Sequence, residues 1–543
     1  MKKSGRKILR IKDEHSDAGL NIALDTLSLG KQAIFFVNTK RGAEALAEKI
    51  ALKVKESSAT LQELSETALN ILPRPTKQCQ RLALVLKKGI AFHHAGLHGQ
   101  QRELIEEGFR KRNIRIICAT PTLAQGVDLP AFRVIIKDLL RYGRRGMDYI
   151  PVLEYEQMAG RAGRPGMEEY GEAIIISQTD SEKEKLVEKY IMGEPEEILS
   201  KLAVEPVLRM YILVLIASDF VNSRKSLNEF FQKTFYAHQF QDLATLQRIL
   251  GKITALLDEW EFLKIHGAVE QEDDFVSAES YHKELLQKDD ARLEATLLGR
   301  RVSELYLDPL SANYILTCLR KATSATGIIT EFSFLFMISR CNELMPYLKV
   351  KMAESDEINE KLVSHDQELL EQEPGTHSDE FEDYLNSFKT ALFFEEWINE
   401  KDEDYLLEKY SIRPGEINAK LELADWLLFC TEELCRLLKY HMMINEVGKL
   451  RIRLKYGAKE ELLALLRLRN IGRVRARILF KNKIKTLSDV READITTLGQ
   501  LLGKNIAIDI KKQVGQDYSA EKIKVKENKR KGQINLMDYD GEE

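Results

Sequence analysis

The sequence predicts an α/β domain built on a parallel sheet, followed by a remainder that is mostly helical. Two observations support this fold class. In the first 195 residues, short apolar runs at 32–37, 89–92, 114–119, 134–137 and 173–177 alternate with stretches of helical periodicity. Such alternation is typical of a doubly wound parallel sheet. Further along the chain, apolar residues recur mainly at helical spacing, so the later domains should be mostly α.

Length and composition narrow the class of protein. A chain of 543 residues should divide into three to five domains. Its six cysteines are scattered, with no CxxC pair and no histidine at metal spacing, which predicts a reduced compartment and no zinc site. No apolar run reaches the roughly 18 residues that a membrane span needs. We therefore expect a cytoplasmic protein without a membrane partner.

Polar residues follow the predicted strands at the points where those strands end. Asn38-Thr39-Lys40-Arg41 comes after the first strand, His93-His94 after the second, and Thr120 after the third. Asp128 lies shortly beyond. Ligands of parallel sheets bind at the carboxyl ends of the strands. The sequence therefore predicts a functional edge at these residues.

The run Gln157–Pro165 contains two arginines, Arg161 and Arg164, at a glycine-flanked helix end. Guanidinium groups match phosphate oxygens and keep their charge, so this pair could grip a phosphate. An ordinary basic loop is the alternative.

Four motifs together resemble the second RecA-like domain of superfamily 2 helicases. They are Phe35-Phe36-Val37-Asn38-Thr39-Lys40-Arg41, Phe92-His93-His94-Ala95-Gly96-Leu97, residues 119–130, and Gln157–Pro165. Their order and spacing are similar to the superkiller-like branch, and within it to archaeal Hjm-type DNA repair helicases, relatives of the polymerase-theta helicase. The resemblance implies that residues 1–195 form a second RecA-like domain.

The resemblance also implies roles for single residues. Arg161 and Arg164 would be arginine fingers that reach the triphosphate of ATP, with Gln157, Gly126 and Asp128 at the same cleft. The backbone of the translocating DNA strand would contact Thr39, Lys40, Arg41 and Thr120. For His93 and His94 we prefer a structural or nucleic-acid-contact role over a metal site, because adjacent histidines at a strand end are poor joint ligands.

The segment Arg141–Pro151 has two glycines between strand-forming residues and predicts a projecting hairpin within residues 134–155. In the resembled family a hairpin at this place separates the strands of a duplex. The candidate wedge residues are Tyr142, Met147 and Tyr149. The alternative is a surface hairpin with structural aromatic residues.

The sequence contains no GxxxxGK[ST] loop, which this class of ATPase needs for its phosphates. Asp13-Glu14-His15-Ser16 mimics a DExH box but lacks the required spacing. We therefore expect a separately encoded first RecA-like domain to complete the site, with ATP and Mg²⁺ bound only then, and no ATP hydrolysis by the chain alone. A degenerate binding subunit is the alternative.

Two mostly helical domains should follow, a winged helix at 196–297 and a ratchet bundle at 298–444. In the family one long bundle helix contacts DNA bases through a basic residue and a tryptophan. The matching segment, Leu344–Leu362, offers Lys349 and Lys351 with Tyr347 in place of the tryptophan, and Trp397 and Trp426 are predicted to be core.

Residues 445–515 carry 17 Lys and Arg against 7 Asp and Glu, which indicates a nucleic-acid partner. Within them, Asn470–Arg477 resembles a helix-hairpin-helix, with Arg473, Arg475 and Arg477 at the start of its second helix and Asn470 in a left-handed turn. The tail 516–543 should be disordered. Its anchors Gln533, Leu536 and Tyr539 resemble a sliding-clamp peptide, with a single-stranded-DNA-binding protein as the other candidate partner.

Together these features predict the translocating and strand-separating portion of an ATP-dependent, 3′-to-5′ DNA helicase. It would act on single-stranded and forked DNA in replication-coupled repair and lie at the nucleoid. Two alternatives remain: a non-catalytic nucleic-acid-binding subunit, and an RNA helicase of the same branch.

Overall fold

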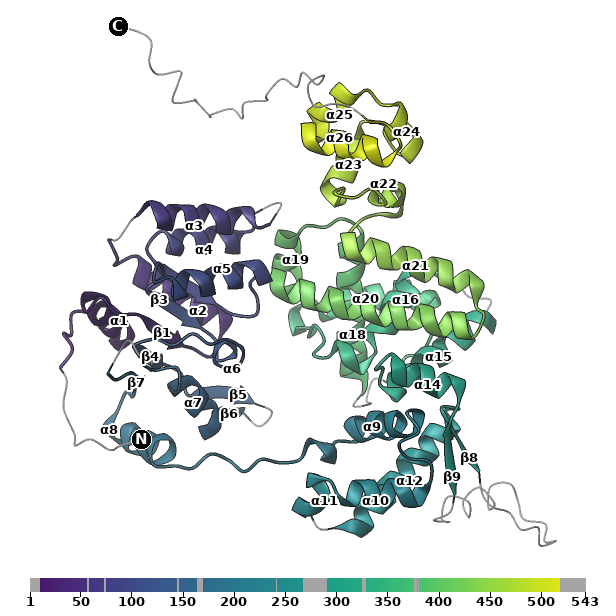
Figure 1. Cartoon of the computed structure of the whole chain (residues 1–543), viewed down its shortest axis with the longest axis horizontal. Coiled ribbons are helices and arrows are strands. Elements are labelled where there is room, and N and C mark those ends of the chain that lie inside the picture. Colours follow the sequence, from purple (N-terminus) through teal and green to yellow (C-terminus); the bar gives the residue numbers. More distant parts are fainter. Residues whose placement is uncertain are drawn as a thin grey trace. The chain divides into compact units, whose positions relative to one another are not determined.

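The structure, a computed structural model, describes residues 10–55, 58–72, 75–143, 146–163, 169–240, 242–266, 291–324, 329–375, 378 and 380–517. The chain divides into two compact units (Figure 1). Unit 1 comprises Met1–Ser200 together with Glu403–Lys420, and unit 2 comprises Lys201–Asp402 together with Leu421–Glu543. The sequence patterns do not predict the return of Glu403–Lys420 to unit 1.

A five-stranded parallel sheet forms the centre of unit 1, as predicted. Its strands lie in the order β2-β3-β1-β4-β7. Phe36 of β1 lies opposite both Ala119 of β3 and Ile136 of β4, so the carboxyl ends of the strands meet at one edge. Every residue of β1, β2, β3 and β4 is buried, which explains their continuous apolar runs. The strands are β1 (Ala33–Phe36), β2 (Ile90–His93), β3 (Ile116–Ala119), β4 (Arg133–Ile136) and β7 (Glu172–Ile175).

Helices pack their apolar faces against this sheet in one continuous core. The predicted helices after the first and second strands are present as α2 (Lys40–Ala51) and α5 (Gly99–Arg110). Between them, α4 (Lys77–Leu86) also packs against β2, and α3 (Ala59–Asn70) packs against α4 and α5. The remaining helices of unit 1 are α1 (Ala18–Ser28), α6 (Thr122–Gly126), α7 (Val152–Ala159), α8 (Asp180–Leu186), α19 (Glu403–Tyr410) and the start of α20 (Pro414–Leu437).

The predicted hairpin is present between β4 and α7. Its strands β5 (Leu140–Gly143) and β6 (Gly146–Tyr149) pair antiparallel, with Tyr142 opposite Met147. The base of the hairpin is tied to the end of β1. There the Asn38 backbone N–H donates to Asp138 at 3.2 Å, and its side-chain amide donates to the Leu140 carbonyl.

Unit 2 is mostly helical, as predicted. It begins with α9 (Glu205–Ala217), α10 (Arg224–Gln232), α11 (Phe235–Phe240) and α12 (Leu243–Glu259), followed by a two-stranded antiparallel sheet of β8 (Leu263–His266) and β9 (Arg292–Ala295). The bundle then consists of α14 (Leu297–Glu304), α15 (Pro309–Ser324), α16 (Glu331–Ser339), α17 (Ser355–His365), α18 (Glu380–Ile398), the rest of α20, and α21 (His441–Tyr456).

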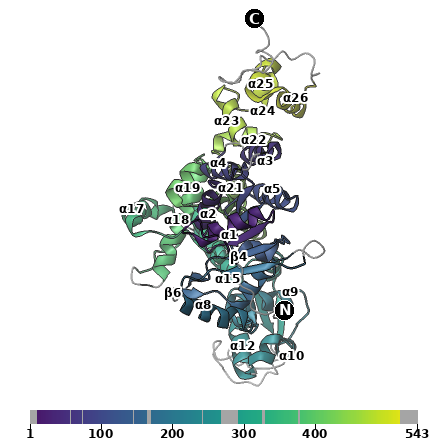
Figure 2. The ribbon, with the colours of Figure 1, turned by 90° about the vertical axis from the view of Figure 1, so that its left-hand side faces the viewer.

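Short helices form a separate core at the C-terminal end of unit 2. Figure 2 shows α24, α25 and α26 clustered together. Leu465, Leu479, Val490, Leu498 and Ile510 are fully buried among them. The helices are α22 (Leu463–Leu466), α23 (Arg473–Lys481), α24 (Leu487–Glu492), α25 (Ile495–Leu502) and α26 (Lys504–Gln513).

Candidate nucleotide and nucleic-acid interface

Arg161 lies just after α7, and its guanidinium is held by the loop that follows β3. Nη1 lies 3.2 Å from a carboxylate oxygen of Asp128, and Nη2 donates to the Ala124 carbonyl at 2.6 Å. Asp128 is 90% exposed, whereas Arg161 is only 26% exposed. The geometry therefore brings Arg161 together with Asp128 and with helix α6, which ends at Gly126. The family resemblance placed Arg161, Asp128 and Gly126 at one cleft.

Helix α7 carries Gln157 on an exposed position, four residues before Arg161. The N-terminus of α7 is held by a residue that follows β7, the last strand of the sheet. The Glu196 carboxylate accepts from the backbone N–H groups of Val152 at 2.7 Å and Leu153 at 3.1 Å. These bonds lower the pKa of Glu196, because they favour its ionised form. Arg164 lies outside the described residues.

The first turn of α2 presents the predicted DNA contacts of the first motif. Thr39 caps the helix, its hydroxyl accepting from the Gly42 backbone N–H at 2.9 Å. Lys40 and Arg41 then lie at the helix N-terminus, where the backbone dipole attracts anions. Arg41 is exposed, whereas Lys40 forms an ion pair with Glu416. Of these two cations, Lys40 has a carboxylate partner among the described residues and Arg41 has none.

Thr120 follows β3 and is almost buried, with 8% exposure. Its hydroxyl lies 2.9 Å from that of Thr122, and its backbone N–H donates to the His93 carbonyl at 3.2 Å. A contact from Thr120 to a DNA strand therefore stays a prediction.

The two adjacent histidines are buried, and each ring contacts a carboxylate. His93 Nε2 lies 3.0 Å from Glu106, and His94 Nε2 lies 3.2 Å from Glu44. Burial lowers the pKa of His94, so the ring is neutral at pH 7 and donates its N–H to the carboxylate. These contacts fit the structural role that we preferred. Among the described residues, no three His, Cys, Asp or Glu side chains gather as a metal site would require.

Glu44 is the centre of a buried polar cluster. Its carboxylate accepts from Gln78 at 2.9 Å and pairs with Arg81 and with Arg413. Burial alone would raise the pKa of Glu44. The hydrogen bonds from His94 and Gln78 and the charges of the two arginines outweigh it and lower this pKa to about 2. Glu44 is therefore ionised at every physiological pH.

Arg413 belongs to the returning segment Glu403–Lys420, and three described ion pairs join this segment to the rest of unit 1. Lys77 at the start of α4 lies 2.6 Å from Glu408, Arg413 Nε lies 3.4 Å from Glu44, and Glu416 pairs with Lys40. Sequence reasoning missed this segment. Its one local signal is Arg413-Pro414-Gly415-Glu416, where proline starts a helix and glycine permits close approach.

In the hairpin, the structure places Tyr149 at the base rather than at the tip. Lys189 lies over its ring at 5.0 Å, and the residue is 36% exposed. Tyr142 and Met147 form the pair next to the glycines, so their backbones lie nearest to the turn.

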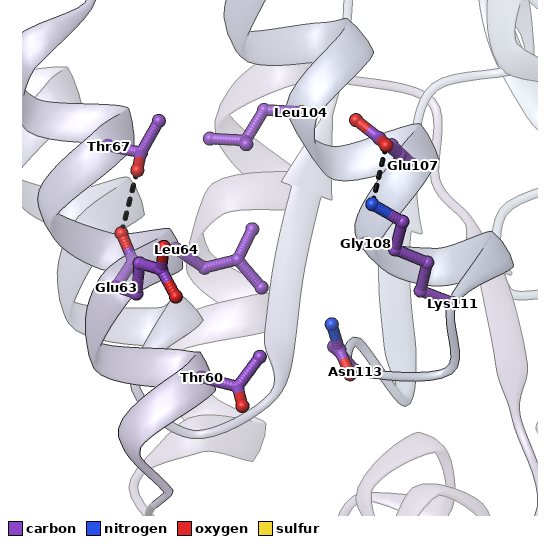
Figure 3. Close-up of a pocket in the computed structure, with 9 residues that line it drawn as sticks. All are labelled: Thr60, Glu63, Leu64, Thr67, Leu104, Glu107, Gly108, Lys111 and Asn113. Atoms are coloured by element: carbon purple, nitrogen blue, oxygen red, sulfur yellow. Dashed lines mark hydrogen bonds and ion pairs between the residues drawn. The ribbon is translucent and has the colours of Figure 1, made fainter.

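Two cavities lie away from this edge. One of about 190 Å³ opens between α3 and α5 and is lined by Leu64, Leu104, Lys111 and neighbouring polar residues (Figure 3). It adjoins Asn113, which precedes β3, and so lies toward the amino ends of the strands, where ligands of parallel sheets do not bind. The other, of about 900 Å³, lies among α15, α16 and α21 of unit 2.

Comparison with known proteins adds a second kind of evidence. Residues 68–166 match the helicase conserved C-terminal domain, and residues 332–457 match archaeal helicase domain 4. The chain is 37%, 36% and 35% identical to the ATP-dependent DNA helicases Hel308 of Methanococcus vannielii, Methanocella arvoryzae and Pyrococcus horikoshii. These matches cover 91%, 96% and 97% of the chain, and 68%, 68% and 69% of the relatives.

The chain belongs to the Hel308 family.

Membership in the Hel308 family confirms the predicted resemblance to archaeal, ATP-dependent DNA helicases. It also agrees with the parallel-sheet domain followed by helical domains. In the described part of the chain, no helix is long and apolar enough to cross a bilayer. The roles of single residues stay predictions, and the structure bears on several of them.

The prediction of one long helix over Leu344–Leu362 is wrong. The chain is extended over 345–351, and helix α17 begins only at Ser355. Pro346 cannot continue a helix, because it lacks an N–H and restricts the residue before it. The extended backbone is held by side chains of α18: Thr390 accepts from Leu348 N–H, Asn386 accepts from Val350 N–H, and Lys389 donates to the Lys349 carbonyl at 2.8 Å.

The side chains of Lys349 and Lys351 are exposed on this extended segment, and Tyr347 is half-buried with its hydroxyl donating to Arg340. Trp397 is core, as predicted, and its indole N–H donates to Leu454 at 2.7 Å. Trp426 is only half-buried. It lies on α20, whose 24 residues make it longer than any other described helix.

The C-terminal module has the predicted turn between two helices. Asn470 adopts φ of 63°, the left-handed conformation that the sequence predicts, and Gly472 precedes α23. Arg473 lies over the Trp397 ring at 4.7 Å, and Arg477 pairs with Glu400 at 2.8 Å and with Glu461 at 2.6 Å. Arg475 is exposed and donates to the Asn470 carbonyl.

Arg473 therefore contacts an aromatic ring and Arg477 two carboxylates of unit 2, whereas Arg475 donates to a backbone carbonyl and stays exposed. The tail peptide with Gln533, Leu536 and Tyr539 lies outside the described residues.

Proposed function

We propose that the chain is the translocating and strand-separating portion of an ATP-dependent DNA helicase that moves 3′-to-5′ on single-stranded DNA and opens forked or branched DNA. One observation carries the proposal. The Arg161 guanidinium contacts Ala124 and Asp128 in the segment that follows β3, and Thr39, Lys40 and Arg41 follow β1, the strand that pairs with β3. Nucleotide and nucleic-acid contacts beside neighbouring strands of one sheet are what coupling of hydrolysis to movement requires.

At the nucleotide side, Arg161, Arg164 and Gln157 would face the triphosphate, with Gly126 and Asp128 beside them. The donor set fits an anionic ligand, because it offers guanidinium groups and an amide. It does not fit Mg²⁺, for which no acidic cluster exists among the described residues. Mg²⁺ and the phosphate-binding loop would come from a first RecA-like domain. Bound ATP would supply the free energy for strand movement, and Arg161 would stabilise charge on the transferred phosphoryl group.

At the DNA side, Arg41 offers the most accessible charge of the first motif. Tyr142 and Met147 are the better placed wedge residues, with Tyr149 supporting the hairpin base. Arg475 offers the exposed charge of the C-terminal module. These contacts would position the sugar-phosphate backbone and would not read sequence.

The ratchet role predicted for Leu344–Leu362 fits α20 better. That role needs a long helix with an aromatic side chain that can stack on bases. Helix α20 has the length, and Trp426 on it keeps part of its surface exposed. The helices α9–α12 with the β8–β9 hairpin would form the winged helix, and α22–α26 the helix-hairpin-helix domain.

The test is to complete the chain with a first RecA-like domain, added in trans, and to measure ATP hydrolysis with and without single-stranded DNA. We expect DNA-stimulated hydrolysis in the mixture and none from the chain alone. Replacement of Arg161 by alanine should lower the rate by about 10³-fold, the scale of an arginine finger. Arg164→Ala should act similarly.

The matched control is Arg110→Ala, which removes an exposed arginine of α5 whose only described ion pair is with Glu106. It should leave the rate unchanged. A mixture without DNA-stimulated hydrolysis would favour the second candidate, a non-catalytic nucleic-acid-binding subunit, which is consistent with the lack of a GxxxxGK[ST] loop in the sequence. Stimulation by RNA but not DNA would favour the RNA helicase alternative.

A further inference from the structure

The returning segment contacts unit 1 through backbone as well as side chains. The Gly415 N–H donates to the Gly96 carbonyl at 3.1 Å. A Cβ on Gly415 would lie 2.4 Å from the carbonyl oxygens of Ala95 and Leu97, and a Cβ on Gly96 would lie 2.6 Å from Arg413 Cδ. Contacts this close leave no room for a side chain at either glycine. The first turn of α20 is thus seated directly on the loop that follows β2.

Charges hold the same turn in place. Arg413 reaches Glu44, a carboxylate that is 3% exposed and also contacts His94, the residue two before Gly96. Glu416, three residues further along α20, pairs with Lys40. Glu44 and Lys40 are both residues of α2, one turn apart. One turn of α20 therefore contacts both the start of α2 and the loop after β2.

We infer that Arg413 is a positioning residue, and that the cluster of Glu44, His94, Gly96, Arg413 and Gly415 is a joint that makes α20 follow the movements of the RecA-like sheet. The inference deepens the proposed function and rests on it. Helix α20 continues without a break from Pro414 to Leu437 and carries Trp426. Movement of the sheet on nucleotide binding would be passed through Arg413 to the helix that we propose as the ratchet.

A buried ion pair suits this task, because loss of one partner leaves an uncompensated charge and loosens the contact. The pair of Lys40 and Glu416, with side chains 29% and 33% exposed, is more accessible to solvent and can exchange with solvent or a phosphate without opening the joint. The joint thus keeps α20 attached while Lys40 remains able to change partner.

The experiment uses Arg413→Gln in the chain completed with a first RecA-like domain. Hydrogen exchange of the chain without DNA should show at least about tenfold lower protection of the Gly415 amide. Duplex unwinding should fall about tenfold, whereas DNA-stimulated ATP hydrolysis stays within about twofold, because Arg413 does not touch nucleotide. Arg413→Lys, which keeps the charge, should restore part of the unwinding. Glu44→Gln is the second variant. It should also lower duplex unwinding more than DNA-stimulated ATP hydrolysis.

The matched control is Arg436→Gln, which removes an arginine from the same helix. Arg436 is 52% exposed and pairs with Glu432 and Glu433 of its own helix, so neither rate nor the Gly415 exchange should change. The inference is overturned if Arg413→Gln lowers hydrolysis and unwinding equally, or if both stay at the wild-type level. Failure of the proposed function would appear separately, as a wild-type mixture that shows no DNA-stimulated hydrolysis.

Discussion

The sheet edge of unit 1 and the C-terminal module of unit 2 each carry a run of basic residues that was predicted to bind DNA, and the structure divides both runs in the same way. At the sheet edge Lys40 is paired with Glu416, whereas its neighbour Arg41 is exposed. In the C-terminal module Arg477 is paired with Glu400, whereas Arg475 is exposed. A local excess of positive charge therefore does not show which cation is available to DNA.

The two regions differ in the depth of the carboxylates that organise them. Glu44 is 3% exposed and contacts two arginines, a histidine and a glutamine. Glu400 is 16% exposed, and it contacts Arg477 and the Lys459 backbone N–H. Both receive partners that are distant in sequence. Glu400, Arg413 and Glu416 all come from one short stretch, which runs from the end of α18 to the first turn of α20. We expect the more deeply buried carboxylate to contribute more to stability, so that the loss of its ion pair destabilises its region more.

The largest effect is expected at Glu44 and should depend on pH. Its pKa is about 2 in the folded protein against an ordinary 4.5, so its contribution to stability is complete above about pH 4.5 and is lost as the pH falls towards 2. A shift of this size corresponds to about 3 kcal/mol. Glu44→Gln should be less stable by that order at pH 7 and should lose less stability between pH 4.5 and 2. Denaturant unfolding at several pH values measures both.

Arg477→Ala tests the difference between the buried Glu44 and the more accessible Glu400 of the C-terminal region. This change leaves Glu400 without its arginine and should lower the free energy of unfolding of unit 2 by about 2 kcal/mol, the scale for a half-buried charged group that loses its partner. Urea denaturation followed by circular dichroism is the measurement. If Arg477→Ala lowered the free energy of unfolding as much as Glu44→Gln does, the proposed relation between burial of the carboxylate and its contribution to stability would be wrong.

The exposed neighbour Arg475 should affect binding rather than folding. Arg475→Ala should weaken single-stranded DNA binding about threefold to tenfold and reduce the slope of log K against log salt by about 0.7. Its unfolding curve should match that of the wild type. Fluorescence anisotropy at four salt concentrations measures the slope. An unchanged slope would mean that DNA does not reach this arginine.

The smallest effect is expected from Glu416→Gln, which frees Lys40. Exposed ion pairs contribute only about 0–1 kcal/mol, so stability should hardly change. DNA affinity at low salt should rise by up to about twofold, because one more cation becomes available. The same anisotropy assay applies, with Arg41→Gln as the comparison in the opposite direction. Weaker binding by Glu416→Gln would show that Glu416 orients Lys40 towards DNA rather than competing for it.

Much of the local structure could be predicted because it depends on neighbouring residues. The apolar runs predicted all five parallel strands, the glycines of Arg141–Pro151 predicted the hairpin, and Asn470 took up the expected left-handed turn. The grouping of Arg161, Asp128 and Gly126 was implied by the resemblance to superfamily 2 helicases. The prediction of a helix over Leu344–Leu362 was wrong because Pro346 and the polar side chains of α18 hold the chain extended. The spacing of apolar residues does not reveal these contacts.

By itself, the sequence determined the class of the fold, which polar residues follow the carboxyl ends of the strands, and the basic character of the C-terminal module, since periodicity, strand ends and charge are read locally. Only the tertiary structure decided that Glu403–Lys420 returns to unit 1, that Lys40 and Arg477 are paired, and that Arg41 and Arg475 are exposed. The reason is physical. An ion pair between Lys40 and Glu416 depends on the path of the whole intervening chain, which no local pattern encodes.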